Sequence, residues 1–318
     1  MDVTELIEGV LAGDRRAVAR AISLVEDGRP ELEPLSAAIY PASGRATTIG
    51  LTGAPGVGKS TLAGALVAAA RGEGLTVAVL AVDPTSPFTG GALLGDRVRM
   101  QEHATDEGVF IRSMATRGHL GGMALAAPEA VRILDAAGYA LIMVETVGVG
   151  QAEVEVAAAT DTTVVVLAPG FGDAVQMAKA GILEVADVFV VNKSDRDGTD
   201  DLVRELRQML HLGPAQEWDP TIVRTTAIDG GGVDELRRAI ESHVSWAVAS
   251  GSLDAKRAKR LRREVETIAA ERFRASAARV LESDGGALAE ALAERRMDPY
   301  RAAAMLVEEA CRARTDPS

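Results

Sequence analysis

The residues with the most specific chemistry form one short run that matches the pattern G-x-x-x-x-G-K-[ST]. An apolar run over 47–52 precedes it and a helix-like segment over 61–67 follows it, which is the context that this pattern requires. Its glycines let backbone N–H groups approach phosphate oxygens, and a helix that starts at about Lys59 turns its positive end toward them. We expect Lys59 to reach the β- and γ-phosphates and the Ser60 hydroxyl to bind Mg²⁺. The residues expected around the phosphates are Gly53, Ala54, Pro55, Gly56, Val57, Gly58, Lys59, Ser60 and Thr61.

A second motif, Asn192-Lys193-Ser194-Asp195, follows an apolar run and matches N-K-x-D. The Asp195 carboxylate can accept two hydrogen bonds from the N1–H and exocyclic amine of guanine, which adenine cannot supply in that arrangement. The wrong base would leave a buried carboxylate unpaired, so discrimination should be strong. We expect Asn192 and Lys193 to hold the loop and cover the base. Four residues alone are also typical of a surface turn, but their place after a phosphate loop favours GTP over ATP.

The next strand-like run ends in Thr226-Ala227-Ile228. GTPases use a short Ser/Thr-Ala turn at this place, where a backbone N–H meets guanine O6. An ordinary strand end would have the same sequence, so this match is the less specific one.

Acidic residues at two further strand ends could serve a metal ion. Asp83 ends one run, and Glu145 ends another in the form D/E-x-x-G, with Gly148 as its glycine. Such carboxylates can hold Mg²⁺ directly or through its water, and Gly148 could offer its N–H group to the γ-phosphate. Most small GTPases have Asp where Glu145 stands, so its role as metal ligand or water-positioning group is open. A strand-end acid can also be only a helix cap.

These motifs need a scaffold that brings strand ends together. From 47 to about 246, strand-like and helix-like segments alternate, and most strand-like runs are apolar throughout. Unbroken apolar runs mean that both faces are buried, which indicates a mostly parallel sheet covered by helices. Ligands bind such sheets at the carboxyl ends of the strands, where the motifs fall. The predicted strands are 47–52, 75–82, 108–113, 139–145, 162–168, 187–192 and 221–226.

The fold class is therefore α/β, a P-loop NTPase domain over 47–246 with helical segments on both sides. Residues 1–46 form an N-terminal helical extension, in which apolar spacing over 3–26 predicts amphipathic helices broken near Gly13-Asp14. Residues 247–318 contain a long basic amphipathic helix, which Gly285-Gly286 interrupts, and further helices. We interpret its basic run over 256–263 as a solvated helix face.

Length, charge and cysteine content limit the classes of protein to which this chain can belong. A chain of 318 residues can bury a real core, and a formal charge of −12 argues against sequence-independent binding to nucleic acid. No uncharged run approaches the length that spans a bilayer, and the acidic start shows no signal-peptide pattern. We expect a cytoplasmic protein without a membrane segment. The single cysteine, Cys311, excludes an internal disulfide and a multi-cysteine metal site.

The motifs together resemble the methylmalonyl-CoA mutase-associated GTPases, which are metallochaperones for adenosylcobalamin-dependent acyl-CoA mutases. Older annotation often names this family arginine/ornithine (LAO/AO) transport ATPases. The likeness covers nearly the whole chain and is specific, because Glu-Thr-Val-Gly-Val-Gly-Gln at 145–151 is not a general GTPase sequence. The stretches that carry it are 53–60, 83–87, 90–100, 112–122, 145–151 and 192–195.

The resemblance implies a GTP hydrolase that binds GTP, GDP and Mg²⁺ and forms a homodimer, with the helical 247–318 region as its dimerisation arm. It also implies a mutase partner whose cofactor loading, protection or reactivation the protein controls. Asp96 would lie in a nucleotide-dependent switch, and 169–182 resembles a further switch. The residues implied at the metal are Ser60, Asp83, Asp96 and Glu145, and those implied in catalysis are Lys59, Asp83, Asp96 and Glu145.

Two details qualify this picture. Thr226 departs from the commoner serine, which should be harmless because the backbone contacts the base. His119 lies in a glycine-flanked loop and is either a switch or partner contact or a local hydrogen-bonding group. No histidine lies in the Asp-x-His-x-x-Gly pattern that ligates cobalamin, so we expect the chain to act on the cofactor-binding protein.

Two other classes stay open. A P-loop kinase or ATPase linked to amino-acid transport would prefer ATP or show no preference. A nickel-delivery GTPase would need Cys and His ligands near the phosphate loop, where this chain has neither.

Overall fold

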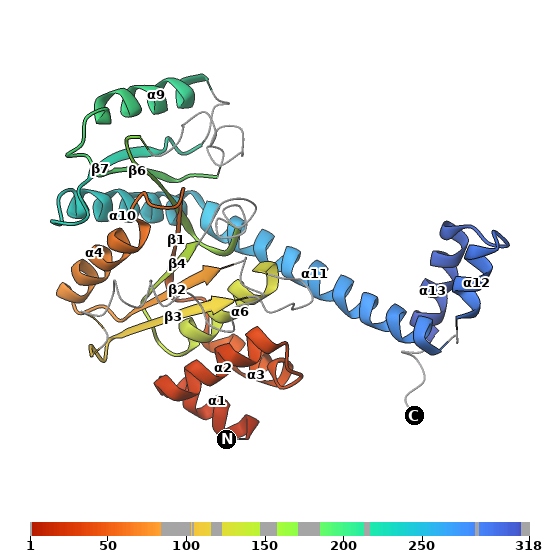
Figure 1. Cartoon of the computed structure of the whole chain (residues 1–318). Helices are drawn as coiled ribbons and strands as arrows, with labels where there is room; N and C mark the ends of the chain where they lie inside the picture. The colour runs from red at the N-terminus through yellow and green to blue at the C-terminus, as the bar shows by residue number, and fades with distance from the viewer. Residues whose placement is uncertain are drawn as a thin grey trace. The chain divides into compact units, whose positions relative to one another are not determined.

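The structure is a computed structural model, which describes residues 2–83, 103, 105–115, 123–146, 158–170, 185–212, 217–283 and 286–312. Its centre is a seven-stranded sheet in the order β3-β2-β4-β1-β5-β6-β7, and every neighbouring pair is parallel (Figure 1). All seven predicted strands are found with small shifts at their ends. Their bounds are β1 Thr47–Thr52, β2 Val77–Asp83, β3 Val109–Ala115, β4 Leu141–Thr146, β5 Thr162–Leu167, β6 Val188–Asn192 and β7 Thr221–Thr225.

Both faces of the sheet are buried, which explains the unbroken apolar runs. In β5, Val164 and Val166 pack into the core on one face, and Val165 and Leu167 pack into the core on the other. Because successive side chains alternate across a strand, a strand covered on both faces needs an apolar residue at every position.

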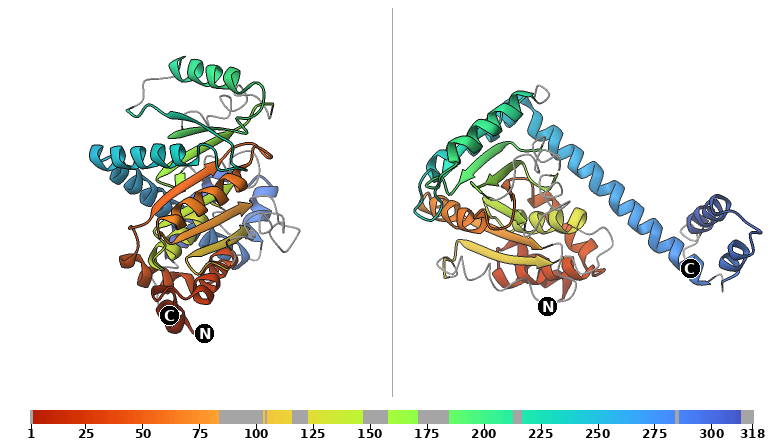
Figure 2. Two further views of the ribbon diagram at one scale, coloured as in Figure 1. Left: turned by 90° about the vertical axis from the view of Figure 1, so that its left-hand side faces the viewer. Right: turned by 45° about the horizontal axis from the view of Figure 1, so that its top comes forward.

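Helices cover each face (Figures 1 and 2). On one face, α4 (Lys59–Gly72) and α10 (Val233–Ser250) pack together against the central strands. On the other face, α6 (Met123–Ala136) and the N-terminal helices share a core with β2, β3 and β4, while α9 (Thr199–Leu212) packs against β5 and β6. The expected α/β architecture is therefore confirmed.

The N-terminal extension forms three helices, α1 (Val3–Leu11), α2 (Arg15–Asp27) and α3 (Leu32–Ile39), followed by the short 3₁₀ turn η1 (Tyr40–Ala42). The predicted break at Gly13-Asp14 is present: Gly13 has φ 73°, and the Asp14 side chain caps α2. Arg112 of β3 reaches α2, where it donates to Ala19 O at 2.7 Å and to Glu26 Oε2 at 2.5 Å. The extension is thus packed onto the sheet as part of its core.

A network of charged groups closes the amino ends of β5 and β6. Asp161, next to β5, is 3 % exposed and accepts hydrogen bonds from Arg257 and Arg260 at 2.7 to 3.1 Å. Asp187, next to β6, accepts from Lys256 at 3.3 Å. Our interpretation of the basic run as a solvated face is therefore wrong for these three cations. They neutralise aspartates that the sheet would otherwise bury without a counter-charge.

The chain divides into two compact units, Met1–Arg260 and Leu261–Ser318. The helix α11 (Ser252–Ser283) begins in the first unit, and the second also contains α12 (Ala287–Ala293) and α13 (Pro299–Arg312). The expected interruption near Gly285-Gly286 falls between α11 and α12. Within the described ranges, no helix has the length and apolar character that crossing a bilayer requires. The limits 47–246 and 247–318 stay a prediction.

Candidate functional site

The loop between β1 and α4 depends on three glycines with left-handed backbone. Gly53, Gly56 and Gly58 have φ of 140°, 81° and 101°, a region that side chains rarely adopt. A Cβ on Gly53 would lie 2.1 Å from Val166 O, and one on Gly58 would lie 2.4 Å from the Asn192 side-chain nitrogen. The glycines therefore allow the loop to pack directly on β5 and on the strand end of β6.

Lys59 begins α4 and is 7 % exposed. Its ammonium group donates to Gly53 O at 2.7 Å and to Ala54 O at 3.1 Å, so the side chain folds back over the loop. A phosphate oxygen is a stronger acceptor for an ammonium group than a backbone carbonyl. The lysine is thus held where an anion in the loop would meet it.

Ser60, in the first turn of α4, and Glu145, near the carboxyl end of β4, lie side by side. The Ser60 hydroxyl donates to Glu145 Oε1 at 2.7 Å, and the two residues are 7 % and 1 % exposed. Asp83 ends β2, the strand beside β4, where Ala81 pairs with Glu145 and Val82 with Thr146. The side chain of Asp83 lies outside what the structure describes, so its distance to Glu145 stays open.

The donors at this place fit Mg²⁺. A serine hydroxyl and a carboxylate are hard oxygen ligands, and Mg²⁺ in nucleotide sites takes one or two such protein groups together with phosphates and water. A buried carboxylate next to a hydroxyl at the helix start provides that set without a full protein cage. Among the described residues, no group of three or more His, Cys, Asp or Glu side chains forms a metal site.

Asn192 connects the phosphate loop with the region expected around the base. Its side-chain amide donates to Val57 O at 2.8 Å, and its side-chain oxygen accepts from Thr225 Oγ1 at 3.0 Å and from Ala227 N at 3.1 Å. Asn192 is 2 % exposed. One buried side chain therefore joins Val57 and the segment 225–227 to the end of β6, and the role of Asn192 around a bound base stays a prediction.

Lys193 and Asp195 form the outer part of the same loop. Lys193 has φ 56°, and its ammonium group donates to Gly56 O at 2.6 Å. Partial burial and the neighbouring charge of Arg196 hold the pKa of Lys193 below its usual value. Asp195 is exposed and accepts no hydrogen bond from the described residues, so its carboxylate is accessible to a base.

The turn after β7 carries the third predicted contact. Thr226 Oγ1 lies 3.1 Å from Ser194 Oγ, which ties the turn to the N-K-x-D loop. The Ala227 N–H group donates to Asn192, as described above, whereas Ile228 is 88 % exposed and its N–H group has no acceptor in the described part of the chain. The contact between a backbone N–H group of this turn and guanine O6 stays a prediction.

Several predicted residues lie outside the described ranges. These are Asp96, Gly148, His119 and the switch-like segment from 171 onward. Of the residues that the structure describes, it brings the phosphate loop, Ser60, Glu145, Asn192 and the 226–228 turn to one end of the sheet.

Sequence reasoning missed two supporting groups. Thr225 donates its hydroxyl to Asn192, and Ser194 contacts Thr226, so the base loop and the turn are joined by side chains as well as backbone. The signal for Thr225 was available, because a polar residue at the buried end of a strand needs a hydrogen-bond partner.

Comparison with known proteins agrees with this geometry. The family model "Methylmalonyl Co-A mutase-associated GTPase MeaB" matches residues 18–281. A relative from Pyrococcus horikoshii that carries a GTPase name is 49% identical over 314 residues, covering 96% of this chain and 98% of the relative. GTPase ArgK of Escherichia coli is 41% identical over 260 residues, covering 79% of this chain and 78% of its own length.

One solved structure, titled as a LAO/AO transport system kinase, superposes with a TM-score of 0.67 and 30% identity, covering 96% of both chains. The mouse protein "Methylmalonic aciduria type A homolog, mitochondrial" is 35% identical over 278 residues, covering 80% of this chain and 66% of its own length. The P-loop fold, the hydrolysis of GTP and the family resemblance are thereby confirmed: this chain belongs to the MeaB family of P-loop GTPases.

Proposed function

We propose that this MeaB-family GTPase uses Mg²⁺, forms a homodimer and acts on an adenosylcobalamin-dependent acyl-CoA mutase. GTP binding and hydrolysis would gate cofactor loading and protect or reactivate the mutase. The description of the family, which includes the words methylmalonyl Co-A mutase-associated, supports this partner, as does the name of the mouse relative.

The observation that carries the nucleotide part is the set of hydrogen bonds at Asn192. They join Val57 of the phosphate loop to Thr225 and Ala227 of the base turn. A site in which the phosphate and base regions are already fixed to each other loses little conformational entropy when the nucleotide binds. Asp195, exposed at the same loop, would then read the guanine edge.

This chain's residues would act on the γ-phosphate mainly by position and charge. The N–H groups of the phosphate loop would hold the β- and γ-phosphate oxygens, and Lys59 would exchange the carbonyls of Gly53 and Ala54 for phosphate oxygens. Ser60 and Glu145 would hold Mg²⁺, which when bound neutralises charge on the β- and γ-phosphate oxygens. Water would attack in line with the leaving oxygen.

The group that positions this water is one of Asp83, Asp96 and Glu145. The hydrogen bond between Ser60 and Glu145 favours a metal-side role for Glu145, because its carboxylate lies at the hydroxyl that is expected to bind the metal. Asp83 and Asp96 are the remaining candidates for the water.

Exposed apolar residues on α11 support the homodimer. Leu261, Val265 and Ile268 recur at helical spacing and are 37%, 65% and 37% exposed. Such a stripe on one helix face is suited to packing against a second helix. A second copy of this chain is the surface that we propose, and sedimentation of V265E against the native protein tests it.

Turnover of GTP and ATP, measured with and without an adenosylcobalamin-dependent mutase from the same organism, tests the whole proposal. We expect hydrolysis of GTP alone and a severalfold increase with the mutase. Absence of any mutase effect on turnover and no binding of the two proteins in sedimentation would overturn the partner assignment. Equal use of ATP would contradict the role of Asp195 and favour the alternative of an ATPase or kinase linked to amino-acid transport.

A further inference from the structure

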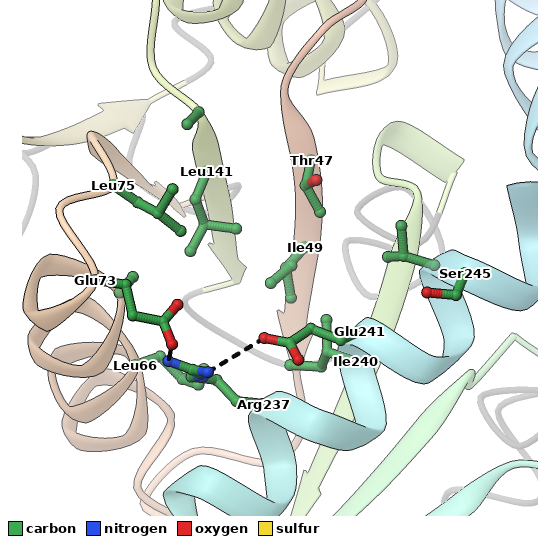
Figure 3. Close-up of a pocket in the computed structure, with 13 residues that line it drawn as sticks. Thr47, Ile49, Leu66, Glu73, Leu75, Leu141, Arg237, Ile240, Glu241 and Ser245 are labelled. Carbon is green, nitrogen blue, oxygen red and sulfur yellow. Dashed lines mark hydrogen bonds and ion pairs between the residues drawn. The ribbon is translucent and has the colours of Figure 1, made fainter.

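A cavity of about 400 Å³ lies between α4 and α10, far along the sheet from the phosphate loop. Its wall includes Thr47 and Leu141, the first residues of β1 and β4, whereas the phosphate loop follows Thr52 at the other end of β1. The cavity is therefore separate from the nucleotide site, on the face of the sheet that α4 and α10 cover (Figure 3).

The inner wall of this cavity is apolar. Ile49, Leu66, Leu141 and Ile240 line it from two strands and two helices, and Leu75 lies at its margin with 40% exposure. The cavity is open to solvent at the side of Glu73, Glu241 and Ser245, which are exposed. Its volume falls within the range of small-molecule pockets, which are mostly apolar with a few polar groups.

The polar groups of the cavity carry net negative charge. Arg237 of α10 pairs with Glu73 at the end of α4 and with Glu241 one turn further along α10, where the nitrogen–oxygen distance is 3.3 Å (Figure 3). Two carboxylates and one guanidinium leave one uncompensated negative charge. Glu73 and Glu241 are 49% and 59% exposed, so both can meet a further cation. The carboxyl end of α4 adds a partial negative charge at the same place.

The geometry points to a binding site for a small amphipathic organic cation, an amine with an aliphatic or aromatic body. The body would fill the space lined by Ile49, Leu66 and Ile240, and the ammonium group would meet an exposed carboxylate oxygen of Glu73 or Glu241, since the Arg237 guanidinium group already lies between them. A carboxylate of the same shape would meet the same two acidic groups and be repelled. Nothing in the proposed GTPase mechanism uses this cavity.

Calorimetric titration of the full chain, saturated with GDP to occupy the nucleotide site, tests the proposal with hexylammonium and hexanoate as matched probes. We expect one hexylammonium per chain and at least fivefold weaker binding of hexanoate, since one charge contact near a surface is worth about a factor of five. Equal affinity of the two probes, or binding of neither, would overturn the proposal.

Two pairs of variants connect this binding to the cavity. E241Q removes the uncompensated charge and should weaken hexylammonium binding about fivefold, whereas E235Q, on the same helix outside the cavity, should not. S245F introduces bulk at the rim and should abolish binding, whereas S242F, an exposed position on the same helix, should leave it intact. These serines are exposed, so neither variant disturbs the core. Unchanged affinity in both E241Q and S245F would place the probe elsewhere and refute the proposal.

Discussion

The two ends of the sheet both bury acidic and basic side chains, but they satisfy them in different ways. At the amino end, Asp161 is surrounded by the guanidinium groups of Arg257 and Arg260. At the carboxyl end, Glu145 takes a hydrogen bond from the hydroxyl of Ser60, and Lys59 donates to backbone carbonyls. The first arrangement pairs full charges with each other, and the second includes hydrogen bonds between charged groups and a hydroxyl or backbone carbonyls.

This difference separates a structural role from a ligand-binding role. A carboxylate enclosed by two guanidiniums is already neutralised and gains nothing from a further ligand. Phosphate oxygens are stronger acceptors for the Lys59 ammonium group than the backbone carbonyls it contacts, and the Ser60 hydroxyl and Glu145 carboxylate are hard oxygen ligands for a metal ion. The carboxyl end is thus suited to Mg²⁺ and phosphates, and the amino end to holding α11 against β5 and β6.

Two lysines, one at each end of the sheet, give the strongest test of this comparison, because both donate to backbone carbonyls. Lys59 bonds to Gly53 O at 2.7 Å, and Lys256 bonds to Asp161 O at 2.8 Å. We expect K59A to lower kcat/KM for GTP by a factor of about 10² to 10³, since it removes charge stabilisation in the transition state. K256A should leave turnover unchanged and reduce the free energy of unfolding by about 1 kcal/mol. Steady-state turnover and urea unfolding of both variants decide this, and the reverse pattern would refute the assignment.

Replacing Asp161 tests how much the charged network at the amino end of the sheet contributes to the free energy of unfolding. D161N keeps the shape of the side chain but leaves Arg257 and Arg260 facing a neutral amide, so the free energy of unfolding should fall by about 3 kcal/mol. The matched control is E266Q, whose partner Arg262 is 82% exposed and whose effect should stay below about 1 kcal/mol. Urea unfolding gives both values. Equal effects of D161N and E266Q would mean that burial of the network contributes nothing.

Base selection at the carboxyl end gives the next effect in size. D195N should weaken GTP binding by roughly 10- to 100-fold and improve binding of xanthosine triphosphate, because the amide oxygen can accept from one guanine donor while its NH₂ group, itself a donor, cannot accept from the other. D197N, an exposed aspartate two residues further along the loop, is the control and should bind GTP normally. Nucleotide titration measures both, and unchanged GTP affinity in D195N would disprove base reading by this residue.

Much of the fold could be predicted because its causes are local. Apolar runs such as that over 162–168 predict strands buried on both faces, and β5 covers Thr162–Leu167. The end of β3 was less predictable. Its polar residues Arg112 and Ser113 suggest that the strand stops at 113, but pairing with β2 continues to Ala115. Pairing with a neighbouring strand extended the element beyond its own apolar pattern.

Motifs in the sequence indicate Lys59 and Asn192 as site residues, and their contacts with a nucleotide stay predictions. The amino-end network was not predictable, because its partners are distant in the sequence and the chain holds 46 acidic and 34 basic residues. No local pattern indicates that Asp161 meets Arg257 rather than another arginine. That pairing is determined by the parallel sheet, which brings the starts of β5 and β6 beside the first turns of α11.

The smallest effect expected is a dependence of stability on pH that belongs to the amino end. Burial alone would raise the pKa of Asp161, but the hydrogen bonds and charges of Arg257 and Arg260 hold it below its usual value. The pKa of Asp187 is likewise lowered, because its bond to His243 and the charge of Lys256 outweigh its burial. A folded-state pKa below the unfolded value of about 3.9 contributes stability that is complete above that value and lost as pH falls through the folded pKa.

The difference in stability between the native protein and D161N should therefore be largest near about pH 6 and should narrow as pH falls below the unfolded-state pKa of about 3.9 and through the lower folded-state pKa of Asp161. The chain's two tryptophans report on this end of the sheet, because Trp218 donates to Asp187 O at 2.8 Å and its ring lies 5.2 Å from that of Trp246. Urea unfolding followed by their fluorescence at several pH values measures the difference. If it stayed constant with pH, the charge of Asp161 would not be what joins α11 to the sheet, and the distinction between the two ends would rest on packing alone.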